Sequence, residues 1–317
     1  MLIQNTMISK LRLRTASVMV AFVAFVLPTV CHAAPSVTPR VIESYPHDTA
    51  AFTQGLLLFE GDFFESTGRY GESSLRRVDV ESGEVMQRIE NDAEEFGEGL
   101  ARVGERLIQL TWQNQVAHAY DLQTFEEQRT FDYEGEGWGL CYDGKELFMS
   151  DGSAQLFVRD PDSFELVRQI SVTDAGEPVT MLNELECVGD HVFANVWQAD
   201  RIVRIEKATG DVSHEIDASG LLSEDEAATA DVLNGIAHDA EWNRFFLTGK
   251  LWPRVFEVTL DFGDEANGGP REPNGCSCSA PGRSRSNGVL AGLVLLGLLR
   301  RDRSTPSERR GGAQREP

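Results

Sequence analysis

The sequence predicts an all-β fold, a five-bladed β-propeller with four-stranded blades that is closed by strands from the N- and C-terminal parts of the chain. A short phrase returns five times, each time a turn residue before the apolar start of a strand: Gln54-Gly55-Leu56, Glu98-Gly99-Leu100, Trp138-Gly139-Leu140, Asn183-Glu184-Leu185 and Asn234-Gly235-Ile236. The middle positions of the phrases are 44, 40, 45 and 51 residues apart. A period of roughly 40–45 residues is that of one four-stranded blade.

Alternating apolar and polar residues predict the strands within each repeat. In the first repeat they cover residues 55–60, 63–67, 75–80 and 85–89, with turns at Gly61-Asp62 and at residues 81–84. The later repeats carry corresponding pairs of segments: 107–111 and 116–121, 147–150 and 155–160, 191–196 and 201–205, and 244–249 and 255–259.

The fifth repeat lacks an outer strand, because its last apolar residues end near Phe262. We expect residues 41–45 to supply this strand, which joins the first and last blades and removes an open edge. An acidic loop, residues 223–228, lengthens the step from the fourth repeat to the fifth. We expect this loop to cover the mouth of the channel.

The N-terminal residues have the pattern of a secretory signal peptide. Residues 1–14 contain three basic residues and no acid, residues 16–30 are apolar, and Ala33-Ala34-Pro35 follow. These are a basic n-region, an apolar h-region and a small-residue cleavage site. We therefore predict a signal peptide over residues 1–34, cut after Ala33 or Ala34, and export through the Sec pathway to the periplasm, the cell surface or the medium. A lipoprotein anchor at Cys31 is the competing reading, and residues 28–30 fit it poorly.

The C-terminal residues also look modular. A Gly/Pro/Ser-rich linker, residues 265–288, contains Cys276-Ser277-Cys278, and an apolar run over residues 289–299 precedes two arginines. Eleven residues at about 1.5 Å each cannot cross a bilayer core of about 30 Å as a helix. The arrangement of residues 289–317 resembles the C-terminal sorting tails of myxobacterial surface proteins, which implies processing or lipidation at Cys276 or Cys278. An ordinary tail anchor or a flexible terminus is the alternative.

The charge of the intervening domain, residues 38–264, argues against two kinds of partner. Of 29 basic and 51 acidic residues in the chain, 17 and 47 lie between residues 15 and 270, so this part carries a charge of about −30. Such a surface repels nucleic acid and anionic membranes. We expect contact with a membrane only through the C-terminal tail.

Two cysteines, Cys141 and Cys187, fall at nearly equivalent places in consecutive repeats, shifted by one residue. That shift puts them on opposite faces of their sheets, and neighbouring blades pack opposite faces together. A disulfide is therefore possible in an oxidising compartment, and two buried thiols are an equal alternative. The domain contains no paired Cys or His spacing typical of structural zinc.

The phrases place unlike side chains around one axis, as expected for a binding or catalytic site. The domain has no Ser nucleophile elbow, no HExxH and no Gly-rich phosphate loop. Lys250 follows an apolar strand, and a buried amine is costly unless it is paired or functional. The structural alternatives are blade packing for each Trp and a Lys–Glu pair that braces the fifth blade.

Eight short motifs in order carry a resemblance to a known family. They are FTQGL (52–56), FGEGL (96–100), LTW (110–112), GWGL (137–140), LNELE (182–186), ANVW (194–197), LNGIA (233–237) and TGK-W-P (248–253). With these motifs the chain resembles plant-type glutaminyl-peptide cyclotransferases, including their bacterial relatives, over nearly all of residues 40–262. The resemblance implies a five-bladed propeller, an aminoacyltransferase that converts N-terminal Gln to pyroglutamate with release of ammonia, and no zinc.

The resemblance also assigns site residues. The general acid/base carboxylate falls on Glu98. The pocket residues fall on Phe52, Gln54, Phe96, Trp112, Trp138, Asn183, Trp197 and Lys250. Intramolecular attack of the α-amine on the γ-amide needs a proton carrier and donors for an oxyanion. A buried carboxylate suits the first task, and Lys250 and Asn183 suit the second.

These assignments predict a metal-independent enzyme without a cofactor, whose partner is a peptide or protein with N-terminal Gln. We expect a monomer, because a closed propeller needs no partner subunit. The alternative is a non-catalytic secreted propeller that binds peptides or carbohydrate through its aromatic residues. Such a binding protein would tolerate the loss of Glu98.

Overall fold

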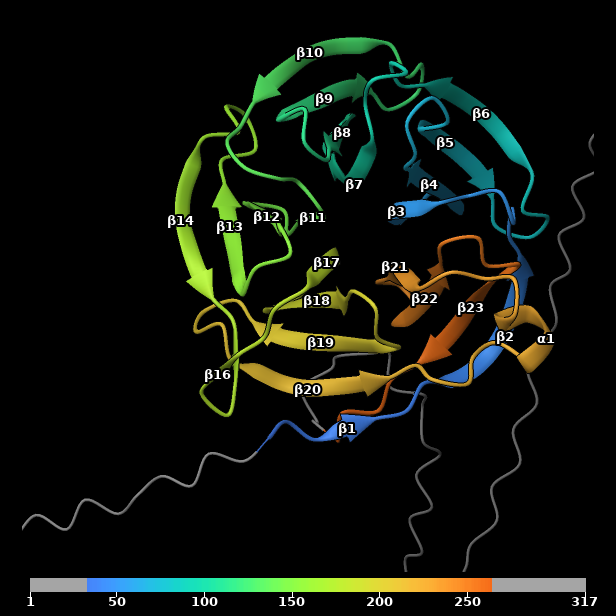
Figure 1. Cartoon of the computed structure of the whole chain (residues 1–317), viewed down its shortest axis with the longest axis vertical. Coiled ribbons are helices and arrows are strands. Elements are labelled where there is room, and N and C mark those ends of the chain that lie inside the picture. The colour runs from blue at the N-terminus through green and yellow to red at the C-terminus, as the bar shows by residue number, and fades with distance from the viewer. Residues whose placement is uncertain (1–32, 264–317) are drawn as a thin grey trace, which may run out of the picture. The chain divides into compact units, whose positions relative to one another are not determined.

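Five blades surround a central axis in the computed structural model, which describes residues 33–263 (Figure 1). The predicted five-bladed propeller with four-stranded blades is confirmed. The first blade contains β3 (Thr53–Phe59), β4 (Asp62–Thr67), β5 (Ser74–Asp79) and β6 (Val85–Glu90). The second contains β7 (Gly97–Val103), β8 (Arg106–Thr111), β9 (Val116–Asp121) and β10 (Glu127–Asp132).

The remaining blades follow the same antiparallel order, from the innermost strand outward. The third contains β11 (Leu140–Tyr142), β12 (Leu147–Met149), β13 (Gln155–Arg159) and β14 (Leu166–Ser171). The fourth contains β17 (Leu182–Val188), β18 (His191–Val196), β19 (Arg201–Glu206) and β20 (Val212–Asp217). The fifth contains β21 (Leu233–Asp239), β22 (Arg244–Gly249), β23 (Arg254–Thr259) and β2 (Arg40–Pro46).

The outer strand of the fifth blade comes from the N-terminal part of the chain, as predicted. Strand β2 pairs antiparallel with β23, and Tyr45 lies opposite Val255. A shorter strand, β1 (Ser36–Val37), adds to the outside of the fourth blade by pairing in parallel with β20. This N-terminal segment therefore covers the outer edges of two neighbouring blades.

The core of the propeller lies between the blades. Among the described residues, each pair of adjacent blades shares its own cluster of buried apolar side chains. Between the first two blades, for example, Phe64 and Leu75 meet Leu100 and Leu107. Burial of this apolar surface holds the blades face to face.

A disulfide joins the third and fourth blades. Cys141 of β11 and Cys187 of β17 form it, so the sequence alternative of two free thiols is wrong. The one-residue offset between the repeats puts the two side chains on facing surfaces of adjacent sheets, as the alternation of side chains along a strand requires.

The closure between the fifth and first blades contains a buried charge network. His47 lies directly after β2, with Nε2 3.0 Å from Glu65 Oε1 and Nδ1 2.8 Å from the carbonyl oxygen of Trp252. Arg76 donates to Glu65 at 2.6 Å and to Asp48 at 2.7 Å. Because both neighbours of the His47 ring accept hydrogen bonds, the imidazole donates from both nitrogens and is a cation.

The acidic loop does not cover the channel, and that expectation is wrong. It forms the short helix α1 (Glu224–Ala227), which lies at the outer edge of the molecule beside β2 (Figure 1). Ser223 and Glu226 make a capping box at its start. Arg254 of β23 pairs with Glu226 at 2.6 Å, and this contact holds the helix beside the outer strands of the fifth blade.

A small hairpin of β15 (Thr173–Asp174) and β16 (Glu177–Pro178) connects the third and fourth blades. Within residues 33–263 no helix is long and apolar enough to cross a membrane. The predicted linker and sorting tail, and nearly all of the predicted signal peptide, lie outside the described residues.

Candidate active site

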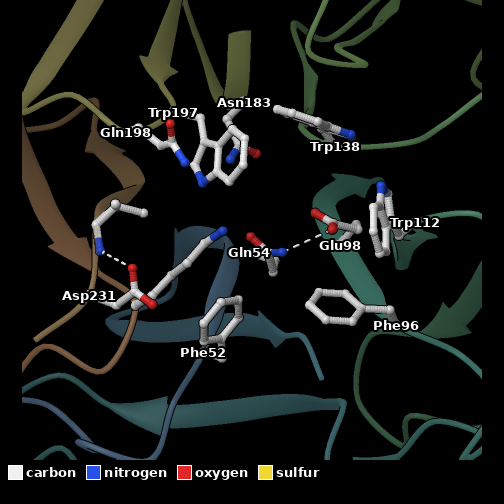
Figure 2. Close-up of a pocket in the computed structure, with 12 residues that line it drawn as sticks. Phe52, Gln54, Phe96, Glu98, Trp112, Trp138, Asn183, Trp197, Gln198 and Asp231 are labelled. Atoms are coloured by element: carbon white, nitrogen blue, oxygen red, sulfur yellow. Dashed lines mark hydrogen bonds between the residues drawn. The ribbon is translucent and has the colours of Figure 1, made fainter. Parts of the chain in front are cut away.

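A pocket of about 480 Å³ opens at the end of the channel where the innermost strands begin. In an antiparallel pair the second strand ends where the first begins, so residues after β8, β18 and β22 join residues from the starts of β3, β7 and β17. All nine residues predicted for the site line this pocket: Phe52, Gln54, Phe96, Glu98, Trp112, Trp138, Asn183, Trp197 and Lys250 (Figure 2). Their chemical roles stay predictions.

The repeated phrase has a structural cause. In four blades the pairing register of the innermost strand shifts at the phrase, for instance between Thr53 and Gly55 and between Gly97 and Leu100. These shifts are β-bulges, which interrupt the ladder and redirect side chains. They turn Gln54, Glu98 and Asn183 into the pocket, although each is at most 4% exposed.

Glycine at the middle of the phrase lets the innermost strands approach one another at the axis. A Cβ atom on Gly139 would lie 2.0 Å from the carbonyl oxygen of Asn183. Glu184 is the exception among the five phrases. Its carboxyl oxygens accept hydrogen bonds from the backbone N–H groups of Leu56 at 3.3 Å and Ile236 at 2.8 Å. Its side chain therefore ties the fourth blade to the first and fifth.

Glu98 has one oxygen held and one free. Gln54 Nε2 donates to Glu98 Oε1 at 2.9 Å, and Figure 2 shows this contact inside the pocket. Asn234 Nδ2 in turn donates to Gln54 Oε1 at 3.1 Å, which fixes the orientation of the Gln54 amide. Glu98 Oε2 is buried and has no hydrogen-bond partner among the described residues. This oxygen is therefore available to a proton or to a bound molecule.

Burial shifts the pKa values of Glu98 and Lys250 in opposite directions. It raises the pKa of Glu98 well above its usual value, an effect that the Lys250 cation opposes and the Glu136 carboxylate reinforces. Burial lowers the pKa of Lys250, against the attraction of Glu98 and Asp231. Perturbation of this kind is typical of groups that exchange protons with a substrate.

Lys250 is not part of a close ion pair. Among the described residues none of its contacts qualifies as a salt bridge, so the structural alternative of a bracing Lys–Glu pair finds no support. Its Nζ lies 4.8 Å from the centre of the Phe52 ring, and the side chain is 4% exposed. A cation–π contact with Phe52 holds the amine in the pocket without neutralising it.

Aromatic rings form the walls. Phe96 packs edge-on against Trp112 with ring centres 5.7 Å apart, and Trp138 packs edge-on against Trp197 at 5.5 Å. In Figure 2 these two pairs lie on opposite sides of Gln54 and Glu98. Glycine allows this arrangement at one point, because a Cβ atom on Gly152 would lie 2.6 Å from the Trp138 ring. The walls are suited to an apolar, uncharged chain segment.

Sequence reasoning missed several residues at the site. Gln198, Asp231 and Val232 also line the pocket. Glu136 lies behind the wall, where it accepts hydrogen bonds from Trp112 Nε1 and Trp138 Nε1. An acidic residue two positions before an indole was a visible signal for Glu136. Gln198, Asp231 and Val232 lie in connections between strands, which carry no periodic pattern.

No metal-binding arrangement accompanies the pocket in the part of the chain that the structure describes. Residues 33–263 contain no group of three or more His, Cys, Asp or Glu side chains placed to hold a metal ion. The polar groups that line the pocket are the carboxyls of Glu98 and Asp231, the amides of Gln54, Asn183 and Gln198 and the amine of Lys250.

Comparison with known proteins identifies the family. Residues 14–260 match the family model described as glutamine cyclotransferase. The chain belongs to the glutamine cyclotransferase family. A family relative from Arabidopsis thaliana, described as glutaminyl-peptide cyclotransferase, is 43% identical over 229 residues, which cover 70% of this chain and 71% of the relative.

A solved structure within the family supports the fold. The crystal structure of Myxococcus xanthus glutaminyl cyclase is 42% identical in sequence, with a TM-score of 0.65. The match covers 72% of this chain and 98% of that one. The similarity therefore extends over almost the whole of the solved glutaminyl cyclase.

Proposed function

We propose that this protein is a glutaminyl-peptide cyclotransferase, which converts the N-terminal Gln of a peptide or protein to pyroglutamate and releases ammonia. Membership of the glutamine cyclotransferase family and 43% identity to a glutaminyl-peptide cyclotransferase support the activity. The observation that carries the mechanism is the buried Glu98, with one oxygen held by Gln54 and the other unpartnered in an aromatic pocket.

Glu98 is proposed to carry one proton through the reaction. Its free Oε2 takes a proton from the substrate α-amine while the amine nitrogen forms a bond to Cδ, the carbonyl carbon of the Gln side-chain amide. It then gives that proton to Nε2 of the side-chain amide as the bond from Nε2 to Cδ breaks and ammonia leaves. A carboxyl whose pKa is raised by burial can perform both steps near neutral pH.

Lys250 and Asn183 are proposed to stabilise the oxyanion that forms on the γ-carbonyl oxygen. Both line the pocket, and within residues 33–263 Lys250 forms no salt bridge with a carboxylate, so its charge is not quenched. Donors placed in advance where charge develops in the transition state are a large source of rate enhancement.

The aromatic walls are proposed to hold the substrate side chain in a curled form. Closing a five-membered ring requires the amine and the γ-amide of one residue to meet, and an extended Gln side chain keeps them apart. The rings of Phe52, Phe96, Trp112, Trp138 and Trp197 leave a confined apolar space beside Glu98. Confinement of the reactive conformation lowers the entropic part of the barrier.

The proposed reaction needs no metal ion or cofactor, because pocket residues can supply every proton transfer and every donor that it requires.

The direct test is to incubate the protein with a Gln-initiated peptide, with and without a chelator, and to measure ammonia and the mass of the peptide. Conversion in both samples supports the proposal, and the same peptide with an acetylated N-terminus should not react. Binding without conversion would instead support the non-catalytic propeller.

Glu98→Gln tests the role of the carboxylate. The amide can still accept the hydrogen bond from Gln54, so the fold should survive while turnover falls by about 10²–10⁴-fold. Wild-type turnover in this variant would contradict the acid/base assignment.

Export is the second proposal. The disulfide between Cys141 and Cys187 is typical of an oxidising compartment. The backbone nitrogen of Ala34 lies 2.9 Å from Asp174 Oδ1, so cleavage after Ala33 would create an ammonium group facing this carboxylate. N-terminal sequencing of the exported protein tests the cleavage position. Detection of an intact leader on the mature protein would contradict it.

The tail, the oligomeric state and the excluded partners remain proposals. We propose that residues 289–317 sort or anchor the protein at the cell surface through Cys276 or Cys278, and that the domain is a monomer that binds no nucleic acid. Replacement of both cysteines by Ser should release the protein from the surface. Light scattering at micromolar concentration tests the monomer.

A further inference from the structure

Glu136 connects two walls of the pocket without lining it. It lies in the loop between β10 and β11, and its Oε2 accepts hydrogen bonds from Trp112 Nε1 at 2.8 Å and Trp138 Nε1 at 3.0 Å. Its other oxygen accepts from Gln113 Nε2 at 3.0 Å. The two indoles come from different blade connections, and Figure 2 shows both of them beside Glu98.

The geometry requires both carboxyl oxygens of Glu136 to accept hydrogen bonds. An indole nitrogen donates only, so two such donors on one oxygen favour the ionised carboxylate. Partial burial opposes ionisation, but the hydrogen bonds from Gln113 and the two indoles outweigh it and lower the pKa of Glu136. Among the described residues Glu136 forms no salt bridge, so its negative charge is not neutralised by a close cation.

We infer that Glu136 is a positioning residue for the cyclisation. One of its oxygens fixes the planes of Trp112 and Trp138, and its charge faces Glu98 from behind the aromatic wall. The inference rests on the proposed function, which it deepens by naming what orients the walls and what helps to set the acid/base group. Glu136 need not touch the substrate for either effect.

The negative charge of Glu136 is one of a few nearby charges and dipoles that influence the ionisation of Glu98. Lys250 reaches Glu98 from the fifth blade and favours its ionisation, whereas Glu136 opposes ionisation. The Tyr133 hydroxyl also lies within electrostatic range of Glu98, and the neutral Gln54 amide holds one of its oxygens. Loss of the Glu136 charge should therefore lower the pKa of Glu98.

Two substitutions separate the effect of charge from that of geometry. Glu136→Gln keeps an oxygen that can accept from both indoles, and the Gln113 amide can turn to pair with the new NH₂ group. In Glu136→Gln the acid limb of the pH profile of kcat should move to lower pH, with little change in KM. Glu136→Ala also removes the hydrogen bonds and should lower kcat/KM by about 10²-fold, because a wall shift of about 1 Å can have that effect.

Glu134→Gln is the matched control. It removes one negative charge from the same loop, but Glu134 is exposed and does not contact the indoles. The inference is supported if only the Glu136 variants change the kinetics as stated. It is overturned if Glu136→Gln and Glu134→Gln have the same pH profile and Glu136→Ala retains wild-type kcat/KM.

A measurement without turnover keeps this test separate from the proposed function. In ¹⁵N–¹H spectra, Glu136→Ala should shift the indole N–H signals of Trp112 and Trp138, assigned with Trp→Phe variants, and leave the signals of Trp242 and Trp252, which do not line the pocket, in place. Unchanged Trp112 and Trp138 signals in a folded variant would overturn the positioning role. A protein that shows the shifts but has no cyclase activity would refute the proposed function and leave the contact itself established.

Discussion

Gln54 donates a 2.9 Å hydrogen bond to one oxygen of Glu98, and the other oxygen of that carboxyl has no partner among the described residues. The two residues occupy the same position of the repeated phrase in neighbouring blades. A bulge in each strand turns them toward one another. The same structural device thus places the acid/base candidate and the residue that orients it.

Gln54→Ala should show how much the orientation of the Glu98 carboxyl contributes to kcat/KM. It leaves both oxygens of Glu98 without a fixed partner, and a hydrogen bond to a charged group contributes about 1.5–3 kcal/mol. We expect kcat/KM to fall by about 10- to 100-fold while the protein stays folded. Gln169→Ala, on the exposed face of β14, is the control and should have wild-type kinetics. Equal kinetics for the two variants would contradict an orienting role.

The pH dependence of kcat should be bell-shaped. Glu98 accepts a proton, so activity falls as the pH drops through its raised pKa. Lys250 acts as a cation, so activity falls as the pH rises through its lowered pKa. Lys250→Arg keeps the charge at high pH and should move the alkaline limb upward, which is measured in pH profiles at saturating substrate. An unchanged alkaline limb would assign it to another group.

Gly152→Ala should damage the site through the Trp138 ring. Gly152 has a φ of 82°, and an added Cβ would lie 2.6 Å from the indole. Gly144→Ala is a close match, because its φ is 93° and nothing lies within 4 Å of its Cβ position. Both variants should lose about 1–2 kcal/mol of stability, but only Gly152→Ala should raise KM. An equal KM in both would show that the ring position is unimportant.

The His47 network predicts how stability depends on pH. Burial opposes the His47 cation, but Glu65 raises the pKa of His47 above its ordinary 6.5, so this contribution is complete below pH 6.5 and disappears as the pH rises through the folded value. Burial acts against ionisation of Glu65 too, but Arg76 and His47 lower its pKa to about 2. Its contribution is present above pH 4.5 and disappears as the pH falls toward 2.

Urea unfolding of His47→Gln between pH 6 and 9 checks this prediction. The wild-type free energy of unfolding should fall with rising pH more steeply than that of the variant. Glu65→Gln should cost about 3–5 kcal/mol at pH 6, because it leaves the buried Arg76 without its closest partner. Parallel slopes for His47→Gln and the wild type would contradict the network's role.

The disulfide should affect stability and leave catalysis unchanged. Cys141 and Cys187 are 46 residues apart, and a bridge over such a segment contributes about 2–4 kcal/mol. A reductant or the double Ser variant should lower Tm, with wild-type kcat at temperatures where the protein stays folded, because neither cysteine lines the pocket. A fall in kcat without a fall in Tm would contradict this separation.

The repeat made the fold predictable, because the same three-residue phrase recurs at the start of the innermost strand in every blade. The phrase also marked the positions of Gln54, Glu98 and Asn183, since a bulge at the phrase redirects the side chain at that position. The outer strand β2 was predictable because an unpaired edge on the fifth blade requires a partner.

The remaining features depend on contacts that no local pattern contains. The acidic loop was misplaced because its position depends on Arg254, a residue of β23 that pairs with Glu226. Glu136 was missed because its importance comes from two indoles on different connections. The sequence did not decide whether Cys141 and Cys187 form a disulfide, since a one-residue offset suits both a disulfide and two buried thiols.

Closure of the ring by β2 has a consequence for biosynthesis. Residues 40–46 are made early, yet their partner β23 ends at Thr259, almost the last described part of the chain. The edge of the fifth blade stays uncovered until both have emerged, and this blade carries Lys250. A nascent or truncated chain that lacks β23 therefore cannot complete the pocket. Activity should appear only once β23 has been made, which keeps shorter unfinished chains from modifying other proteins.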